Sequence, residues 1–425
     1  MLQTSIELSD EERCLLAGES GEAARLAMQI LVRMAPIYGA KSLLPVTRAH
    51  IDGCIYEGDA GLEFAEWLAS SGGHVAVPTT LNVISLDRAR WREHGLSAEY
   101  ADKAYRLGKA YVDMGAIPTF TCAPYQVGYQ PTFGEQIAWA ESNAVAYANS
   151  VLGARTNRYG DYLDISCALV GRVPAAGLHL TENRLGQVLV TLSGMSPELF
   201  QEDDFYPVLG YLLGTIVDDE IPVVAGLEAS PTDDQLKAMA AATATSGSIA
   251  LFHIIGITPE APTLDDAFGA RAPQREVVVT MEELRRARAE LTTVEGDELD
   301  VVAFGSPHCS LEECRTLAAL MSGGRAASSV EVWVTTSRIV RELLDRAGVL
   351  SQLIDFGARV TADTCIVVSP LVKRGARTMM TNSAKYAHYA PGLIGVQSIF
   401  GSTKDCVASA IAGRVVLAPS SAWSA

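Results

Sequence analysis

Residues 299–314 read LDVVAFGSPHCSLEEC, an apolar run that ends in small polar residues and a cysteine before an acidic segment begins. An unbroken apolar run bounded by turn residues is typical of a strand that is buried on both faces of a parallel sheet. The stretch that follows, LEECRTLAALMSG at 311–323, has the apolar spacing of a helix. A strand, a polar turn and a helix in this order form the repeating unit of a doubly wound α/β domain.

The same unit repeats toward the C-terminus. VEVWVTTS at 330–337 leads into a helical segment at 338–350, and ARVTADTCIVV at 358–368 and ARTMMTNSAKY at 376–386 follow. We therefore predict a doubly wound α/β domain within residues 291–425, with ligands bound at the carboxyl ends of its strands. Residues 366–368 are predicted to form a strand, and residues 420–425 a loose tail.

The N-terminal region predicts further alternation of strands and helices. Residues 10–36 are predicted to form one helix, and PTLDDAFGARAPQREVVVT at 262–280 is the best candidate for a linker or long surface loop. Short strands are predicted within 42–53, 74–85, 117–125, 188–194, 221–228 and 249–258, and helices within 62–72 and 135–153. The predicted fold class is therefore a multi-domain α/β/α protein with mostly parallel sheets, divided into an N-terminal α/β region 1–290 and the domain 291–425.

Composition limits the function classes. With 425 residues, 48% of them hydrophobic, the chain can bury sizeable cores in two or more domains. A formal charge of −17 argues against nucleic-acid binding, which needs a basic surface. No apolar stretch reaches the roughly 18 residues that span a membrane, and the acidic N-terminal segment is unlike a secretory signal. We expect a cytoplasmic protein, in which the eight cysteines do not form disulfides and any special ones among them serve metal binding or catalysis.

Three cysteines lie in loop-like stretches that each follow an apolar run. They are Cys122 in TFTCAPYQ, Cys309 in AFGSPHCS and Cys365 in TADTCIVV. Their separation excludes a C-x-x-C motif, so only the fold can bring them together. Three converging thiolates can hold an iron–sulfur cluster and leave one iron open to substrate. A zinc site built from His308, Cys309 and Cys314 is the alternative, although this spacing fits no standard zinc finger.

The segment TNSAKYAHYAPG at 381–392 is the second group of candidate functional residues. It offers Asn382, Ser383 and Lys385 to a ligand within one turn, at a predicted strand end. Because the chain contains few lysines, one among small polar residues at a strand end favours anion binding, with a solvated loop as the alternative. Glu141 is a further candidate, although it could simply complement the dipole of the helix that it precedes.

The chain resembles the aconitase X family, a divergent branch of the aconitase superfamily. The resemblance rests on LAGESGEAARLAMQILVRMA, AHIDGC, PTTLN, TCAPYQ, AESNAV, GSPHCS, TADTC and TNSAKYAHYAPG, which occur in order between about residues 7 and 415. It implies an aconitase-like multi-domain α/β/α fold, and a dehydratase with an iron–sulfur cluster (2Fe–2S, 3Fe–4S or 4Fe–4S) held by Cys122, Cys309 and Cys365. The implied substrate contacts are Gly53, Cys54, Ile55, Asn82, Val83, Glu141, Ser142 and Lys385.

The resemblance also implies the reaction and a partner. The family dehydrates cis-3-hydroxy-L-proline in bacteria and mevalonate 5-phosphate in archaea. The few cationic residues available for a phosphate favour the first substrate, and a mevalonate 5-phosphate dehydratase large subunit is the alternative. A non-catalytic metal-binding scaffold protein is another, but it would be expected to have lost one of the three cysteines.

Catalysis of this reaction needs a group that stabilises the substrate carboxylate and a base. Lys385 would hold the carboxylate, and Ser383 is a candidate local base, although an unactivated serine is weak. The chain leaves no segment for the small swivelling domain of aconitase-type enzymes. We therefore expect that domain as a separate small subunit that forms a heterodimer with this chain and supplies the base.

Overall fold

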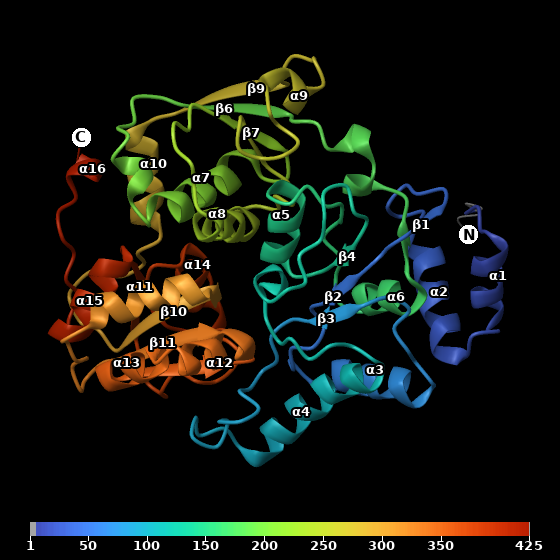
Figure 1. Ribbon diagram of the computed structural model, residues 1–425, viewed down its shortest axis with the longest axis horizontal. Helices are drawn as coiled ribbons and strands as arrows, with labels where there is room; N and C mark the ends of the chain where they lie inside the picture. Colours follow the sequence, from blue (N-terminus) through green and yellow to red (C-terminus); the bar gives the residue numbers. More distant parts are fainter. Residues whose placement is uncertain (1–5, 425) are drawn as a thin grey trace.

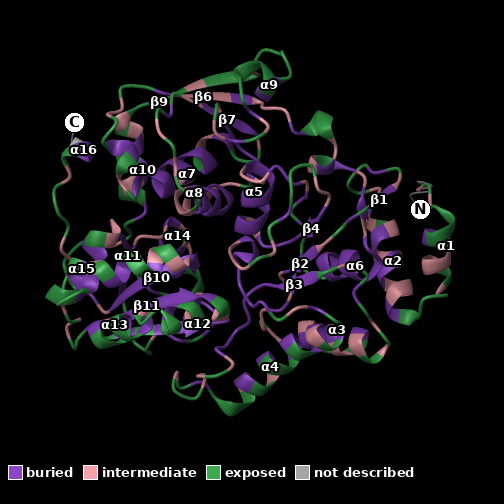
Figure 2. Ribbon diagram, in the orientation of Figure 1, coloured by how far each residue is buried: buried purple, intermediate pink, exposed green. Residues whose placement is uncertain are grey.

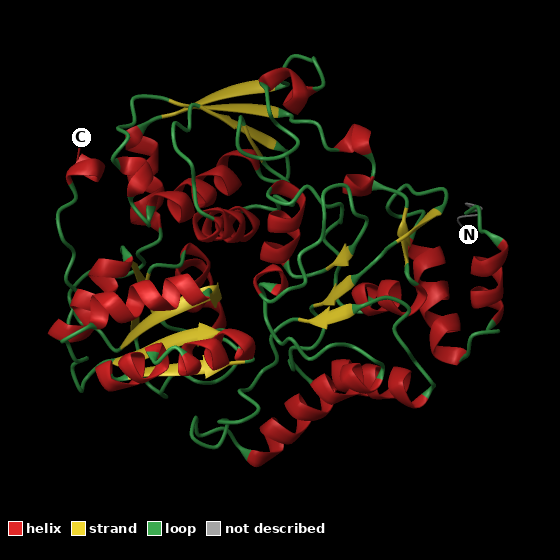
Figure 3. Cartoon of the chain, viewed as in Figure 1, coloured by secondary structure: helices red, strands yellow, loops and turns green. Residues whose placement is uncertain are grey.

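Parallel strands separated by helices build most of the chain, as the alternation of apolar runs and amphipathic segments predicts. The computed structural model describes residues 6–424 and arranges them in three lobes, coloured blue to teal, green to yellow, and orange to red in Figure 1. Each lobe contains a parallel sheet, and helices pack around these sheets in Figure 3. The predicted class, mixed α/β with mostly parallel sheets, is confirmed.

The first lobe has a three-stranded parallel sheet of order β3-β2-β4 and a two-stranded antiparallel sheet, β1-β5. Its elements are α1 (Asp10–Ala17), α2 (Glu22–Met34), β1 (Leu43–Pro45), β2 (Ala49–Ile51), α3 (Asp59–Ser70), β3 (Thr79–Leu81), α4 (Ala98–Asp113), η1 (Pro124–Gln126), β4 (Ala138–Trp139), α5 (Ser142–Ser150), α6 (Leu163–Val170) and β5 (Arg172–Pro174). The carboxyl ends of β2 and β3, which are paired in parallel, lie side by side. Segments that follow these two strands can therefore contribute to one site.

Two predictions for the first lobe are wrong. The single helix predicted over 10–36 is divided into α1 and α2, because Gly18 and Gly21 have φ values of +90° and +99°, which a continuing helix cannot contain. The strand predicted within 117–125 is reduced to one bridge between Thr80 and Ile117. Phe120, three residues later, has a φ of +39°, so the chain turns away from the sheet before Cys122.

The second lobe has a four-stranded parallel sheet of order β8-β7-β6-β9. Its elements are β6 (Val188–Leu192), α7 (Phe205–Val217), β7 (Pro222–Ala225), α8 (Asp233–Ser246), β8 (His253–Ile254), α9 (Leu264–Phe268), β9 (Arg275–Val279) and α10 (Met281–Glu290), with short 3-10 turns η2 (Gly177–His179), η3 (Thr181–Asn183) and η4 (Leu199–Gln201) before them or between them. The linker predicted over 262–280 is wrong, since this segment forms α9 and β9. The valines at its end pair with β6 as an edge strand, which outweighs the Pro and Gly content.

The third lobe has a five-stranded, fully parallel sheet of order β12-β11-β10-β13-β14. Its elements are β10 (Val301–Cys309), α11 (Leu311–Met321), β11 (Glu331–Thr336), α12 (Arg338–Arg346), α13 (Val349–Phe356), β12 (Ala358–Ala362), β13 (Thr378–Thr381), α14 (Ala384–Leu393), β14 (Gln397–Phe400), α15 (Thr403–Ala412) and α16 (Ser421–Ser424). In chain order this is 3-2-1-4-5, the order of a doubly wound sheet. The division predicted at residue 290 stays a prediction.

Two details of the third lobe differ from the predictions. Residues 366–368 form turns and not a strand. The tail predicted over 420–425 is in part a short helix, α16, whose Trp423 is 8% exposed and donates its indole N–H to Asp204 Oδ1 at 2.8 Å. Burial of a large aromatic ring with a satisfied N–H holds this end of the chain against the second lobe.

The interior of the molecule lies along the sheets, as the purple segments in Figure 2 show. All nine residues of β10 are buried, with separate apolar clusters on the two faces of its sheet. This explains why its sequence is apolar without alternation. Over residues 6–424, no helix is long and apolar enough to cross a membrane.

Candidate active site

The doubly wound sheet changes direction between β10 and β13, and this is where such folds bind ligands. β10 ends at Cys309, and Asn382 to Lys385 directly follow β13. Ser383 is the N-cap of α14, where its hydroxyl accepts the Tyr386 N–H at 3.1 Å and donates to the Ser306 carbonyl. The predicted placement of Cys309 and of the 381–392 segment at strand ends is therefore confirmed.

A buried lysine of the second lobe supports the turn after Cys309. Lys237, on α8, donates to Asp234 Oδ1 at 2.9 Å, to the Glu313 carboxylate and to the His308 carbonyl at 3.3 Å. Burial disfavours its charge, but Glu313 and Asp234 outweigh burial and raise the pKa of Lys237. Glu313 also completes a capping box with Ser310 at the start of α11. The β10–α11 turn is thus anchored to α8.

Cys122 lies in the first lobe, yet it contacts the third lobe. The backbone N–H of His308 donates to Cys122 Sγ at 3.2 Å, and the Asn143 side chain donates to the Cys122 carbonyl at 2.9 Å. Cys122 is 7% exposed. Burial and the Glu141 carboxylate raise the pKa of Cys122 to about 12, while the Lys385 ammonium opposes this rise.

Cys365 follows β12 in a turn that is held by buried charges. Asp363 has a φ of +68°, and its carboxylate accepts from Arg88 Nε of the first lobe at 2.9 Å and from Arg338 of α12 at 2.6 Å. Two residues on, Cys365 is 7% exposed. Burial raises the pKa of the Cys365 thiol, and nearby N–H groups and Lys385 oppose the rise. The segments of Cys122, Cys309 and Cys365 are therefore fixed at one place between the first and third lobes.

The spacing of these thiols does not fit a site for a single zinc ion. Within residues 6–424, the only three candidate ligands whose ligand atoms all lie within 4.8 Å of one another are Glu202, Asp203 and Asp204. Tetrahedral zinc with Zn–S bonds of about 2.3 Å would place its sulfurs about 3.8 Å apart. Neither the three cysteines nor the alternative set of His308, Cys309 and Cys314 is assembled to share a single ion.

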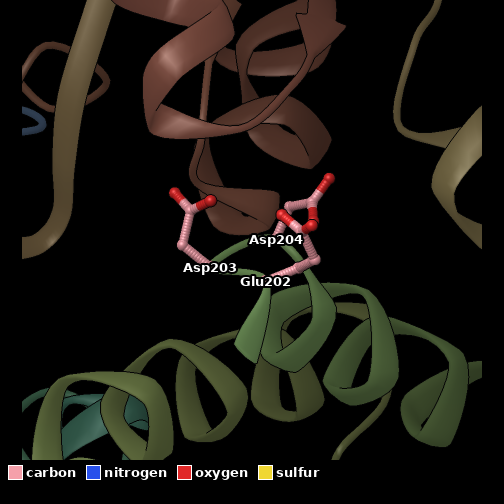
Figure 4. A group of neighbouring side chains, drawn as sticks. All are labelled: Glu202, Asp203 and Asp204. Carbon is pink, nitrogen blue, oxygen red and sulfur yellow. The ribbon is translucent and has the colours of Figure 1, made fainter. Parts of the chain in front are cut away.

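Figure 4 shows the side chains of this acidic group, whose carboxylates are bonded to protein donors. Asp203 accepts the Thr403 N–H at 2.8 Å, and Asp204 accepts from Arg288 Nε at 2.9 Å and from Trp423. These contacts join the start of α7 to the C-terminal segment. We therefore interpret the three acidic residues as a structural contact that holds the lobes together.

Lys385 and Glu141 form a buried ion pair across the first and third lobes. Lys385 Nζ lies 2.5 Å from Glu141 Oε1, and the two side chains are 14% and 5% exposed. Burial disfavours the ammonium, but the Glu141 charge prevails and raises the pKa of Lys385. Glu141 is also the N-cap of α5 and accepts the Ala144 N–H at 2.7 Å. Lys385 therefore stays charged beside Cys122.

The loop after β2 carries the predicted contacts Gly53, Cys54 and Ile55. The Cys54 thiol points inward and donates to the Asn82 carbonyl at 3.1 Å, so its side chain joins the ends of β2 and β3. Gly53 and Ile55 are half-buried. Asn82 is buried and donates its amide to Asp52, and its Oδ1 is a buried acceptor with no partner among the described residues. An unsatisfied buried acceptor beside the loop is consistent with a ligand donor there.

Two aspartates near this loop were not predicted. Asp164, on α6, accepts the N–H groups of Asp52 at 2.8 Å and Gly53 at 3.3 Å, which fixes the loop. Burial, followed by Glu141 for Asp52 and by Asp161 for Asp164, raises the pKa of both carboxyls to about 7. Asp52 lies inside the AHIDGC motif, and its position beside Gly53 was the available signal. Asp164 had none, because it is far away in sequence.

A cavity of about 410 Å³ adjoins the cysteine site. Ser306, Pro307 and Cys309 line it from β10, Ser383 and Lys385 line it from the start of α14, and α8, α11 and α15 close it. The volume is within the range of small-ligand pockets. Gly53, Asn82 and Glu141 are not among its lining residues, so Lys385 lies between the cavity and the first-lobe group. Val83 is buried and Ser142 half-buried near that group.

Family models match most of the chain. The aconitase X first, second and third domain models match residues 5–182, 186–289 and 299–412, respectively. The chain belongs to the aconitase X family. The recognised motifs therefore did identify the family, and its dehydratase members place this chain among the carbon–oxygen lyases.

Characterised relatives support this assignment. The chain is 53% identical to cis-3-hydroxy-L-proline dehydratase of Pseudomonas aeruginosa, covering 95% of this chain and 70% of that protein. It is 38% identical to the phosphomevalonate dehydratase large subunit of Methanosarcina mazei, covering 96% and 98%. The crystal structure of holo aconitase X from Thermococcus kodakaraensis superposes with a TM-score of 0.85 at 34% identity, covering 95% of this chain and all of that one.

Proposed function

We propose that this aconitase X chain dehydrates cis-3-hydroxy-L-proline. The observation that carries the choice of substrate is the 53% identity to a cis-3-hydroxy-L-proline dehydratase, against 38% to a phosphomevalonate dehydratase large subunit. The reaction removes the proton from Cα and hydroxide from C3. The resulting enamine tautomerises to Δ1-pyrroline-2-carboxylate.

We further propose that Cys122, Cys309 and Cys365 hold an iron–sulfur cluster. The donor set supports this proposal: three buried, free thiols, a backbone N–H directed at one sulfur, and an ammonium nearby that favours thiolates. The sulfur atoms of the three cysteines do not all lie within 4.8 Å of one another, and such a set could hold a cluster, which is larger than a single ion. When bound, the cluster supplies a Lewis-acidic iron that assists the departure of hydroxide.

The other residues of the site would bind and orient the substrate. Lys385 offers the substrate carboxylate a permanent positive charge, which also stabilises the negative charge that develops on that carboxylate as Cα loses its proton. Asn82 offers an unpartnered buried acceptor to a substrate donor such as the ring amine. Glu141 keeps Lys385 in place, and the 53–55 loop and Ser142 border this group. Ser383 acts as the N-cap that positions Lys385.

We propose that the base is supplied by a small swivelling-domain subunit. Several relatives are named phosphomevalonate dehydratase large subunits, which supports a partner subunit for this chain. The contacts of Ser383 favour this division, because its hydroxyl already caps α14 and no side-chain base among residues 6–424 is bonded to it. The active species would then be a heterodimer.

The experiment is an assay of the anaerobically purified chain, with and without the small subunit, on both substrates. We expect a brown protein that forms Δ1-pyrroline-2-carboxylate from cis-3-hydroxy-L-proline only with the small subunit, and that leaves mevalonate 5-phosphate unchanged. Turnover of mevalonate 5-phosphate alone would overturn the choice of substrate. Robust turnover by the single chain would overturn the proposed subunit division.

A further inference from the structure

His308 contacts each of the three cysteine-bearing segments. It precedes Cys309 in β10, and its backbone N–H donates to Cys122 Sγ at 3.2 Å. Its ring Nδ1 lies 3.0 Å from the Thr121 hydroxyl, next to Cys122. Its ring Nε2 lies 3.0 Å from the carbonyl oxygen of Thr364, next to Cys365. The side chain is fully enclosed, with 1% of the residue exposed.

The partners determine the tautomer of this ring. A carbonyl oxygen only accepts, so Nε2 carries the proton and donates to Thr364. In the neutral ring, Nδ1 then accepts the proton of the Thr121 hydroxyl. The Thr121 oxygen in turn accepts the Ala123 N–H at 3.2 Å, on the far side of Cys122. Every polar group of His308 that faces this site therefore has one directed partner.

We propose that His308 is a positioning residue that sets the mutual placement of Cys122, Cys309 and Cys365. The cysteines come from three loops of two lobes, and no other residue of the described chain is bonded to the neighbours of all three. A cluster binds with full affinity only if its ligands are held at the correct separation before it arrives. This inference rests on the proposed iron–sulfur function.

A buried histidine can also be a purely structural residue, and the chain contains a matched example. His179 is 1% exposed, and its two ring nitrogens contact the Tyr159 hydroxyl and Gln136 Oε1, each at 2.6 Å. Neither partner adjoins any of the three cysteines in sequence. Its loss should lower stability as much as the loss of His308 without an effect on the cluster.

The experiment compares full-length variants that are reconstituted anaerobically with iron and sulfide. His308→Phe keeps the ring shape and removes both ring hydrogen bonds, and His308→Gln restores a donor that reaches Thr364. Thr121→Val removes the hydroxyl that contacts the ring, and Thr121→Ser retains it. His179→Phe is the control. The measurements are iron and sulfide per chain, visible circular dichroism, electron paramagnetic resonance, and the rate of cluster loss to a chelator.

We expect His308→Phe to lose cluster about 10- to 100-fold faster than wild type and to show altered spectra, the usual scale for removing such a supporting contact. His308→Gln should lose cluster more slowly than His308→Phe, and Thr121→Val should lose it at a rate between those of His308→Phe and wild type. Thr121→Ser and His179→Phe should lose cluster at the wild-type rate. Wild-type spectra and loss rates in His308→Phe and Thr121→Val would overturn the inference.

Two outcomes are kept apart by further variants. If His308→Phe does not fold, Thr121→Val decides, because it leaves the ring and its packing in place. Serine variants of Cys122, Cys309 and Cys365 test the proposed ligands themselves. If the cysteine variants retain the cluster, the proposed iron–sulfur function is wrong. If they lose it while Thr121→Val and His308→Phe keep an unchanged cluster, only the proposed role of His308 is wrong.

Discussion

Replacing Lys385 by methionine is the most direct test of how the site binds a carboxylate. The side chain stays unbranched and loses its ammonium group, and Glu141, 5% exposed and held by the Ala144 N–H, is left as an unpaired anion. Two unit charges about 4 Å apart attract by about 4 kcal/mol at the effective dielectric constant of about 20 that suits enclosed pairs. The substrate loses most of this attraction and meets the Glu141 charge instead.

We therefore expect Lys385→Met to lose about 3–4 kcal/mol of transition-state stabilisation, which lowers kcat/KM by about 10²- to 10³-fold. The assay is steady-state formation of Δ1-pyrroline-2-carboxylate by the chain reconstituted with its small subunit, with iron content measured on the same samples. Adding Glu141→Gln to Lys385→Met removes the unpaired anion and should raise kcat/KM again by about 30-fold, because a like charge about 7 Å away repels by about 2 kcal/mol. A fall of less than about threefold in Lys385→Met at normal iron content would refute this reasoning.

Two further predictions concern stability. Burial raises the pKa of Asp164 to about 7 from an ordinary value of 3.8, so its contribution to stability is complete below about pH 4 and is lost as the pH rises toward 7. Asp164→Asn should therefore flatten the fall in melting temperature between pH 4.5 and 8, and an unchanged slope would contradict this. Lys237→Met leaves Asp234 and Glu313 without their cation and should lower the free energy of unfolding by about 2–3 kcal/mol. This is less than the cost of breaking a fully buried ion pair, because both carboxylates are partly exposed. Urea unfolding followed at α8 and α11 would measure it, and a change below about 0.5 kcal/mol would show that Lys237 does not join the lobes.

Much of the fold was predictable because it depends on local pattern. The apolar run 301–309, the helical spacing that follows it, and the repetition of this unit predicted a parallel, doubly wound sheet with Cys309 and the 381–392 segment at strand ends. The errors arose where long-range pairing outweighed local composition. Residues 275–279 form a strand because β6 is beside them, although Pro and Gly precede them.

The three cysteine ligands were chosen from the order of the motifs and the family resemblance. That they hold an iron–sulfur cluster stays a prediction. Sequence periodicity could not identify the residues that hold the site together. His308 appeared only as a candidate zinc ligand, because Thr121, which its ring contacts, lies in another lobe. Lys237 and Asp164 gave no signal, because Glu313 and Asp52, which they contact, are distant in sequence. A hydrogen bond between lobes depends on how separately folded sheets pack, and neighbouring residues in sequence do not encode that directly.

The sequence by itself determined the class of this protein: mixed α/β with parallel sheets, a member of the aconitase X family, with three isolated cysteines after apolar runs. The tertiary structure decided that the segments of these cysteines meet between the first and third lobes, that Lys385 is paired with Glu141, and that the ring of His308 spans the gap between two of the segments. The physical reason is the range of the interactions. Apolar periodicity is set within one strand or helix, whereas directed hydrogen bonds and buried charges exist only after the lobes have packed.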